Sequence, residues 1–381
     1  MMVAMRSFGF RANSFLFKKA GAVSVAVGLL AVAATMLAAQ GIDSKTAADD
    51  YHTNPKFLAA VKEAREMERE KHAGFAIDAY RKANKIAGGR CVECVAGVYK
   101  MQMMEGSYKD AIGTAAEMEA MGTTPLVKSV ADYDRGRALI AKDGEKAKPE
   151  QLEAQRAAFQ TAVDVYPGNM AAVFNEGQVL ARMGRMDDAK KDFELCLNNL
   201  KPGDTAYLRV KHFAEDPELS THRMAPAFEV TSLDGAKFNL DAMGGRVVLI
   251  DFWATWCGPC NEELPHLKKI AKEFAGQPFV MISVSSDKDE AAWKEFIQKH
   301  EMTWVQYRDA DHKLGDEFGV SSIPHYFTID SDGVLTSEMM GSGSDVEGKL
   351  KKLIAKAEAA KVQAAQVGSA RGAAAAAGSG N

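Results

Sequence analysis

The stretch DFWATWCGPCNEELP at 251–265 constrains the fold of this chain more than any other part of its sequence. The apolar run VVLIDFWA at 247–254 has the pattern of a buried strand, and NEELPHLKKIAKEF at 261–274 has apolar residues at helical spacing. Cys257 therefore stands where a strand leads into a helix, and Cys260 lies one turn further along that helix. The sequence thus predicts two neighbouring thiols at a helix N-terminus.

Thiols in this position indicate redox chemistry. The unpaired N–H groups and the positive end of the helix dipole stabilise a thiolate and lower the pKa of Cys257. Cys260 is close enough to form a disulfide with it. A zinc site would need two more soft ligands nearby, and no cysteine follows Cys260 in the sequence. A C-x-x-C pair beside a strand–helix–strand pattern therefore predicts a redox couple and no metal site.

The N-terminal segment and the net charge indicate where the protein acts. A formal net charge of −4 over 381 residues argues against nucleic-acid binding. Residues 1–40 join a basic leader without acids to an uninterrupted apolar run at 20–39. We expect an export segment, either a signal peptide cleaved near Ala39 or a retained inner-membrane anchor. Either way, the rest of the chain is expected in the periplasm or another extracytoplasmic space, where disulfides persist.

Residues 57–203 have apolar residues at helical spacing and no strand signals, after a polar linker at 41–56. The segments EGSYKDAI at 105–112 and MGRMDDAK at 183–190 both place alanine five residues after glycine. With Phe193, this pattern resembles tetratricopeptide repeats, paired helices in which small residues allow close approach and an aromatic side chain fills the gap. Four repeats are expected, at 57–91, 92–125, 129–169 and 170–203. We expect their surface to bind a protein or peptide partner. An irregular helical bundle is the alternative.

After a second linker at 204–224, the pattern changes at residue 225 to alternating strands and helices. The segment 228–240 predicts a hairpin around Asp234-Gly235. Further strands are expected at 279–284, 303–307, 323–330 and 334–339, with helices at 290–299 and 346–359. The Ala- and Gly-rich tail at 360–381 is predicted to be disordered. The predicted fold class is multidomain, an all-α helical-repeat domain followed by an α/β domain with a central mixed sheet.

The segment 225–359 carries a set of motifs known from one family. They are WCGPC at 256–260, the FWATW around its start, Glu263 and Pro265 on the helix, Ile323-Pro324, and the hairpin at the start of the segment. Together they resemble exported thioredoxin-fold thiol-disulfide oxidoreductases of the TlpA and ResA type. Cytosolic thioredoxins lack the leading hairpin, so the resemblance points to the exported branch.

By this resemblance, Cys257 is the attacking thiol, Cys260 is the resolving thiol, and Pro324 is a cis-proline beside them. A cis bond would leave the backbone of Ile323 free to pair with an extended substrate segment. The resemblance places the substrate-binding surface on Trp256, Gly258, Pro259, Ile323 and Pro324.

Two carboxylates are implied by the same resemblance. Asp251 matches the buried acid of thioredoxins that exchanges a proton with Cys260, although an amide is more common there in the exported relatives. Burial would disfavour its charged form and suit it to proton transfer near neutral pH. Glu263 matches a glutamate near the disulfide in the exported relatives. The alternative for Glu263 is an ordinary solvated helix carboxylate.

Cys91 and Cys94 repeat the C-x-x-C spacing after Gly88-Gly89 breaks the preceding helix, but no strand leads into them. No histidine stands directly after Cys94, which excludes a c-type haem. Three interpretations stay open: a structural disulfide or packed thiols, a second redox couple, or a Cu(I) site with Met101, Met103 and Met104. The remaining cysteine, Cys196, stands where a repeat requires a small buried residue, and we expect an inert thiol there.

The resemblance implies an exported enzyme that reduces protein disulfides and needs no cofactor beyond its redox-active disulfide. Gly258-Pro259 between the cysteines is more typical of reductants than of oxidants. A reductant in an oxidising compartment needs an electron donor, so we expect a membrane thiol carrier, with cytochrome c maturation or copper-site assembly as the pathway. Two alternatives stay open: a repeat-based interaction scaffold with a docking module, and a thiol peroxidase, for which Thr255 stands too close to Cys257.

Overall fold

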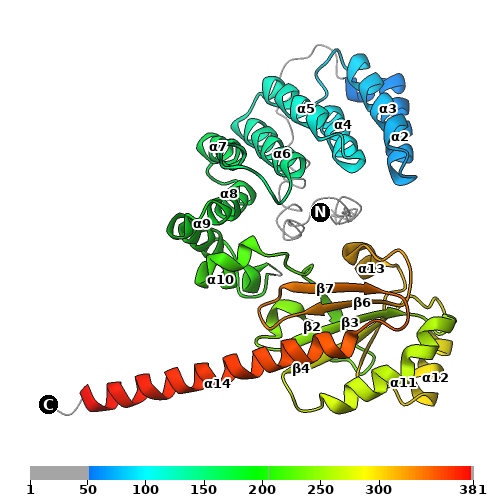
Figure 1. Ribbon diagram of the computed structural model, residues 1–381. Coiled ribbons are helices and arrows are strands. Elements are labelled where there is room, and N and C mark those ends of the chain that lie inside the picture. The colour runs from blue at the N-terminus through cyan, green and yellow to red at the C-terminus, as the bar shows by residue number, and fades with distance from the viewer. Residues whose placement is uncertain (1–50, 205, 379–381) are drawn as a thin grey trace, which may run out of the picture. The chain divides into compact units, whose positions relative to one another are not determined.

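The computed structural model describes residues 51–204 and 206–378, which divide into two compact units, one ending at Thr221 and the other beginning at His222 (Figure 1). The first unit is helical and the second contains a mixed sheet with helices, so the predicted multidomain layout is confirmed. The export segment predicted at 1–40 lies outside the described residues. Within the described part of the chain, no helix is both long and apolar enough to cross a membrane.

The first unit consists of helix pairs joined by short loops. The pairs are α2 (Pro55–Arg69) with α3 (Ala73–Ile86), α4 (Val92–Glu105) with α5 (Tyr108–Met121), α6 (Pro125–Asp143) with α7 (Pro149–Val165), and α8 (Met170–Arg182) with α9 (Met186–Asn198). Each helix packs against the next along the chain, and the helices follow a curved row in Figure 1. These pairs coincide with the four expected repeats, and their assignment to the tetratricopeptide family stays a prediction.

Glycine residues allow the two helices within the third pair, and those within the fourth pair, to pack closely. A Cβ atom on Gly136 of α6 would lie 2.6 Å from the ring of Phe159 on α7. A Cβ atom on Gly177 of α8 would lie 3.0 Å from the ring of Phe193 on α9. Both rings are fully buried. The two helices of each pair therefore approach as closely as the glycine allows, and the aromatic ring fills the gap, as expected for the repeats.

The segment predicted as a linker, 204–224, instead forms helix α10 (Tyr207–Glu215) and a 3-10 turn, η3 (Pro217–Thr221). Phe213 of α10 is fully buried, stacked on Phe174 and tilted against Phe193 with ring centroids 6.0 and 5.4 Å apart. Without α10 these rings would face solvent at the end of the helical row. The linker prediction was wrong because a nine-residue helix depends on this burial rather than on a long periodic pattern.

The second unit is built on a five-stranded sheet with the strand order β5-β4-β3-β6-β7. The strands are β3 (Val247–Trp253), β4 (Phe279–Ser285), β5 (Val305–Arg308), β6 (His325–Ile329) and β7 (Leu335–Met340). The first three are mutually parallel, and β6 and β7 are antiparallel to their neighbours. The predicted hairpin is present as a separate antiparallel pair, β1 (Glu229–Thr231) and β2 (Lys237–Asn239).

Helices cover both faces of this sheet. They are α11 (Gly258–Glu273), α12 (Glu290–Lys299), α13 (Lys313–Phe318) and α14 (Val346–Gly378). On one face, Leu249 of β3 packs with Leu267 of α11 and Leu350 of α14. On the other face, Phe252 packs with Phe318 of α13 and with the β1–β2 hairpin. Successive residues of β3 point to opposite faces, so Asp251 lies on the same face as Leu249, under α11.

Helix α14 runs from Val346 to Gly378, whereas the sequence predicted a helix at 346–359 and disorder beyond it. The last buried side chain described in α14 is Ala357. The further turns are rich in alanine, which has the highest helix propensity of all residues. The helix therefore extends beyond the predicted end at residue 359, and this propensity explains how it can do so without apolar side chains to bury.

Replacing Phe213 by alanine tests the role of α10. We expect the helical unit to lose about 3–5 kcal/mol of its free energy of unfolding, because a large buried ring is removed. Urea unfolding of the full chain, followed by far-UV circular dichroism, measures this loss. Phe75→Ala is the control, since Phe75 is 70% exposed and its loss should change the stability by less than about 0.5 kcal/mol. Equal effects of the two substitutions would show that α10 does not stabilise the unit.

Candidate active site

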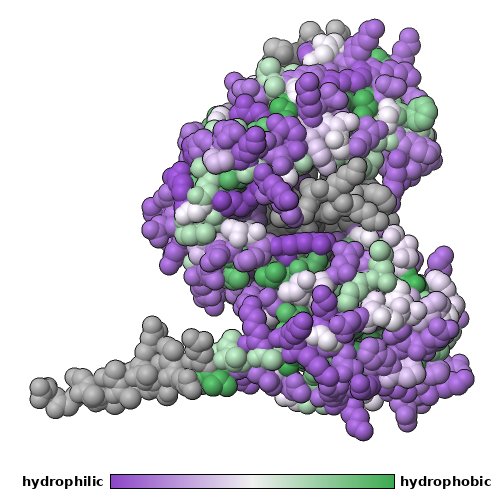
Figure 2. Space-filling view, viewed as in Figure 1, coloured by the Kyte–Doolittle hydropathy of each residue, from purple (hydrophilic) through white to green (hydrophobic). Residues whose placement is uncertain are grey.

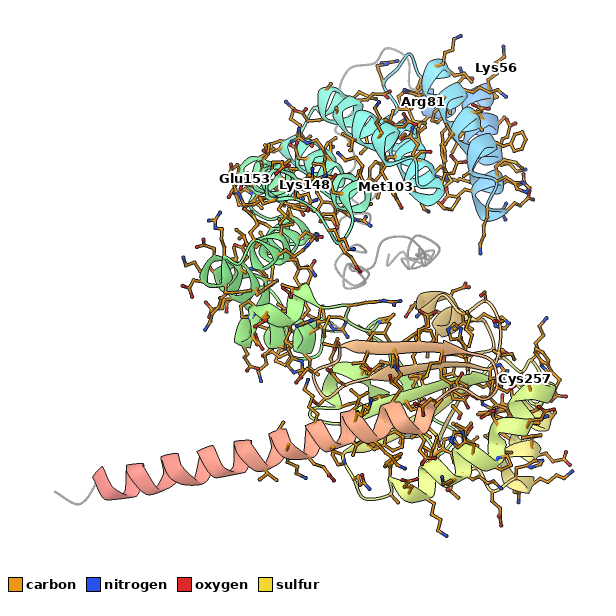
Figure 3. All side chains as sticks on the ribbon, in the orientation of Figure 1. Lys56, Arg81, Met103, Lys148, Glu153 and Cys257 are labelled. Carbon is orange, nitrogen blue, oxygen red and sulfur yellow. A yellow bond between two sulfur atoms is a disulfide. The ribbon has the colours of Figure 1, made fainter. Side chains whose placement is uncertain are left out.

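The Cys257–Cys260 pair lies where β3 leads into α11 (Figure 3). Cys257 is the N-cap residue of α11, and its Sγ accepts a hydrogen bond from the backbone N–H of Cys260 at 3.2 Å. The two residues form a disulfide with an S–S distance of 2.01 Å. Pro259 occupies the first turn, where its missing N–H costs no helical hydrogen bond. The structure therefore places the pair as the sequence predicted, at the positive end of a helix dipole.

The strand-to-helix turn is held by a buried carboxylate that the sequence did not reveal. Asp287 accepts hydrogen bonds from the backbone N–H and the hydroxyl of Thr255, at 2.9 and 2.7 Å. The side-chain amide of Asn261 donates to the carbonyl of Thr255 at 3.0 Å. These contacts fix the backbone just before Cys257. The direction of the first turn of α11 is therefore set independently of the disulfide.

The disulfide is packed on its inner side and bordered by an exposed aromatic residue. Cys257 and Cys260 are 4% and 5% exposed and belong to one apolar cluster with Trp253 and Leu264. The neighbouring side chain of Trp256 is 69% exposed. A large exposed aromatic beside a nearly buried disulfide provides contact area for a partner that approaches the sulfur atoms.

The Ile323–Pro324 peptide bond is cis and directly precedes β6. The side chain of Ile323 packs against the cluster that contains both cysteines. The carbonyl of Pro324 accepts a hydrogen bond from the backbone N–H of Gly341 at 3.0 Å. The structure thus brings the predicted cis-proline loop and the disulfide into one cluster.

Asp251 is buried in the middle of β3, with 1% of its surface exposed. Its Oδ2 accepts a hydrogen bond from the hydroxyl of Ser283 at 2.9 Å, and that hydroxyl accepts one from the indole N–H of Trp304 at 2.8 Å. The pKa of Asp251 is raised to about 7, mainly by burial; the hydrogen bond from Ser283 opposes this shift, and the negative charge of Glu263 adds to it. The carboxyl group therefore gains and loses its proton near neutral pH, as a proton acceptor for a thiol must.

Glu263 is not a free surface carboxylate, because its side chain is only 14% exposed. Its Oε1 accepts a hydrogen bond from the backbone N–H of Gly343 at 2.6 Å, and its Oε2 lies 3.3 Å from Nδ1 of His266. The other ring nitrogen of His266 lies 3.5 Å from Oε2 of Glu347 on α14. Glu263 is thus tied to the loop after β7 and, through His266, to a second helix.

Sequence reasoning found the residues of the motif and missed those that surround Asp251. Ser283 and Tyr326 face Asp251 from β4 and β6, opposite it in the strand register. His266, one turn after Glu263 on α11, could have been found from its i, i+3 spacing to that glutamate. The partners on other strands have no such local signal.

The second pair, Cys91 and Cys94, also forms a disulfide at the start of a helix. The Sγ atom of Cys91 accepts a hydrogen bond from the N–H of Cys94 at 3.1 Å, and the N–H of Cys91 donates to Oδ1 of Asn84 at 3.0 Å. The two cysteines are 0% and 1% exposed within an apolar cluster of the helical unit. This enclosed position is compatible with the structural interpretation, which stays a prediction.

The methionines of α4 divide between two apolar clusters, and Met101 and Met104 lie in or against the cluster of the cysteines. Cys94 and Met101 are two helical turns apart, which is roughly 10 Å along the axis. Met103 belongs to a different apolar cluster from the cysteines. Among the residues that the structure describes, no group of three or more His, Cys, Asp or Glu side chains could hold a metal ion. A Cu(I) site of cysteine and methionine sulfurs would use a different set of ligands, so the Cu(I) interpretation stays a prediction.

Cys196 is buried on α9 and forms no disulfide. Burial raises the pKa of its thiol to about 12, with a further contribution from the charge of Asp192. A thiol of this kind stays protonated at neutral pH, which agrees with the expected inert role.

Comparison with known proteins identifies relatives of the second unit. The family described as Redoxin matches residues 220–354. The thiol-disulfide oxidoreductase ResA of Bacillus thuringiensis (strain Al Hakam) is 30% identical over 143 residues, 37% of this chain and 83% of ResA. The thioredoxin-like protein YneN of Bacillus subtilis (strain 168) is 31% identical over 122 residues, 32% of this chain and 71% of YneN. The solved structure of a thiol-disulfide oxidoreductase from Bacteroides fragilis NCTC 9343 is 29% identical, with a TM-score of 0.32, over 34% of this chain and 98% of that one.

The buried carboxyl of Asp251 should make the stability of the disulfide form depend on pH. An unfolded aspartate has a pKa of about 3.9, and in the folded protein the pKa is about 7. Between these values the folded state holds a proton that the unfolded state has lost, so stability falls as the pH rises. Asp251→Asn should remove this loss, which amounts to about 2–4 kcal/mol at pH 8.

Thermal unfolding of both proteins between about pH 4 and pH 8 measures this effect. The melting temperature of Asp251→Asn should rise above that of the wild type as the pH increases. The control is Glu262→Gln, because Glu262 is an exposed neighbour of the site. Parallel melting curves for wild type and Asp251→Asn across this range would contradict a raised pKa at Asp251.

Proposed function

The chain belongs, through its second unit, to the ResA family of thiol-disulfide oxidoreductases, and from this we propose that it reduces disulfides in protein substrates through Cys257 and Cys260. The observation that carries the proposal is the Cys257–Cys260 disulfide at the N-terminus of α11, with a buried acid on the strand beneath that helix. The cis bond before Pro324 and the exposed Trp256 beside the pair support it.

The first step forms a mixed disulfide. In the reduced enzyme, the Cys257 thiolate, stabilised by the helix N-terminus, attacks one sulfur of a substrate disulfide. The substrate S–S bond breaks as the new S–S bond to Cys257 forms, and the released substrate thiolate takes up a proton. Ile323 lies before the cis-proline, where its backbone would pair with an extended substrate segment.

The second step resolves this intermediate. Cys260 gives its thiol proton to Asp251, and its thiolate attacks the sulfur of Cys257. The enzyme disulfide forms and the second substrate thiolate leaves, so two electrons have passed to the substrate. A pKa of about 7 suits Asp251 to accept this proton at neutral pH. The disulfide form of the enzyme then awaits reduction by an electron donor.

We further propose that the enzyme acts outside the cytoplasm as a reductant. The apolar segment 20–39 supports export, and Gly258-Pro259 between the cysteines supports reduction rather than oxidation. A membrane thiol carrier would then supply the electrons, and cytochrome c maturation or copper-site assembly would consume them. The reduction potential of the Cys257–Cys260 pair tests the direction, since thioredoxin lies near about −270 mV and the oxidant DsbA near about −120 mV.

The helical unit is proposed to recruit a protein partner. Its successive helix pairs present an extended surface, and hydrophilic side chains cover most of the face shown in Figure 2. Two large apolar side chains of the first pair are exceptions, because Phe75 is 70% exposed and Leu58 is 52% exposed. Apolar side chains of this size on a polar surface are suited to contact with another protein.

Substitution of each active-site cysteine separates the two chemical roles. Cys257→Ser should abolish reduction of insulin disulfides, because the attacking thiolate is lost. Cys260→Ser should still react once and then remain as a mixed disulfide, visible on a non-reducing gel and released by dithiothreitol. Cys196→Ser is the control and should keep full activity. Normal insulin reduction by Cys257→Ser would refute the proposed reaction through Cys257.

The Cys91–Cys94 disulfide should be dispensable for this reaction. Replacing both cysteines by serine should lower the free energy of unfolding by about 2 kcal/mol, because the disulfide closes a very short loop. Insulin reduction should stay near the wild-type rate. Turnover below about a tenth of wild type with an unchanged melting curve would instead identify a second redox couple, since a relay can lose rate without losing stability.

A further inference from the structure

Asp251 needs a route by which its proton reaches solvent, and this requirement rests on the function proposed above. The residue is 1% exposed and lies between two neighbouring strands of the sheet. Its Oδ2 is bonded to Ser283, while Oδ1 has no hydrogen-bond partner among the described residues. A proton taken from Cys260 would remain trapped there unless another group accepts it. The question is which neighbour of Asp251 does so.

No chain of proton acceptors leads away from Asp251 through Ser283. The Ser283 hydroxyl donates to Asp251 and accepts from the indole N–H of Trp304. An indole N–H can donate a hydrogen bond but cannot accept one. A proton that moved from Asp251 to Ser283 would therefore find no acceptor at Trp304. These two residues orient the carboxyl group and close that side of it.

Tyr326 lies on the other side of Asp251, on strand β6. It stands directly across from Asp251 in the antiparallel register of β3 and β6, where paired side chains have Cβ atoms about 4.5–5.5 Å apart. Tyr326 is 1% exposed, and its hydroxyl has no hydrogen-bond partner in the part of the chain that the structure describes. A hydroxyl both donates and accepts, so it can pass a proton without a change in its own charge.

The electrostatics agree with this placement. Burial raises the pKa of Tyr326 above its usual value, and the negative charges of Asp251 and Glu263 raise it further. The hydroxyl therefore stays protonated at neutral pH, and the charges of both carboxylates act on it. A hydrogen bond from this hydroxyl to either carboxylate would therefore have to form during the reaction, as catalytic hydrogen bonds often do.

From Glu263 a chain of contacts leads to the surface. Its Oε2 lies 3.3 Å from Nδ1 of His266, whose ring is 32% exposed, and Nε2 of His266 lies 3.5 Å from Glu347. Hydrogen bonds from Lys269 and Lys351 lower the pKa of Glu347 to about 2. Glu347 therefore stays ionised and orients His266 without taking the proton. Histidine is the residue type best suited to exchange a proton with solvent near neutral pH.

We propose that Tyr326 and His266 join Asp251 and Glu263 into a proton path from the active site to solvent. When Asp251 holds the proton of Cys260, the Tyr326 hydroxyl accepts that proton and gives its own to Glu263. Glu263 passes a proton to Nδ1 of His266, and His266 releases one to solvent from its exposed ring. One proton leaves for each disulfide formed, every group of the path returns to its initial charge, and the same path runs backwards when the disulfide is reduced again. Tyr326 and His266 thus act through Asp251 and not on the sulfur atoms.

The test uses Tyr326→Phe and His266→Gln in the full chain. Oxidation of the reduced protein by insulin is followed in a stopped-flow instrument from pH 6 to 8 at low buffer concentration. We expect each variant to lose roughly tenfold in the rate of disulfide formation near pH 7, because proton transfer then limits the step. Imidazole at tens of millimolar should restore His266→Gln, whose site is partly exposed, and should not restore Tyr326→Phe, whose site is buried.

Matched controls separate the path from general damage. Tyr307→Phe removes a half-buried tyrosine that packs on the other face of the sheet, and His300→Gln removes an imidazole that stacks on Phe296 of α12. Both should keep the wild-type rate and its pH profile. If Tyr326→Phe does not fold, His266→Gln with its imidazole rescue still decides the question.

A double substitution tests the coupling to Asp251. If Tyr326 acts through Asp251, adding Tyr326→Phe to Asp251→Asn should cause no further loss of rate. Wild-type rates and pH profiles in both single variants would overturn the path while leaving the proposed function intact. Absence of insulin reduction in the wild type would instead refute the function itself.

Discussion

Burial of β3 in the centre of the sheet determines both the position and the chemistry of the active site. All seven residues of β3 are buried, with β4 on one side and β6 on the other. Because the strand ends at Trp253, the chain turns there into α11 and places Cys257 at the helix N-terminus. The same burial encloses Asp251 and raises the pKa of its carboxyl group to about 7. One packing constraint thus positions the sulfur atoms and raises the pKa of the carboxyl group beneath α11.

The elements that the sequence predicted best are those in which local pattern and tertiary environment agree. The helix expected at 290–299 is present with the same bounds, and the strand expected at 279–284 differs by one residue. The short helices α10 and α13 escaped prediction because nine and six residues are too few for a periodic signal. They form because Phe213 and Phe318 are buried against other elements.

The residues of the candidate site also fall into those that the sequence could identify and those that it could not. Cys257, Cys260, Glu263 and Pro324 could be identified because they belong to motifs with fixed spacing along the chain. Ser283 and Tyr326 could not, because strand register alone sets them opposite Asp251, and a shift of one residue would turn each to the other face of the sheet. The environment that tunes the acid is therefore encoded in the pairing of distant segments and not in the motif.

The two disulfides share the C-x-x-C spacing but differ in their surroundings. In both pairs the first cysteine caps a helix and its sulfur accepts a hydrogen bond from the N–H of the second. A dithiol that resolves a mixed disulfide must also pass a proton from its second thiol to a nearby group. Asp251 beneath α11 is the group proposed to take that proton. The backbone N–H of Cys91 instead bonds to Asn84, whose amide does not titrate. The proposed redox role of Cys257–Cys260 and the structural interpretation of Cys91–Cys94 therefore rest on their surroundings and not on their spacing.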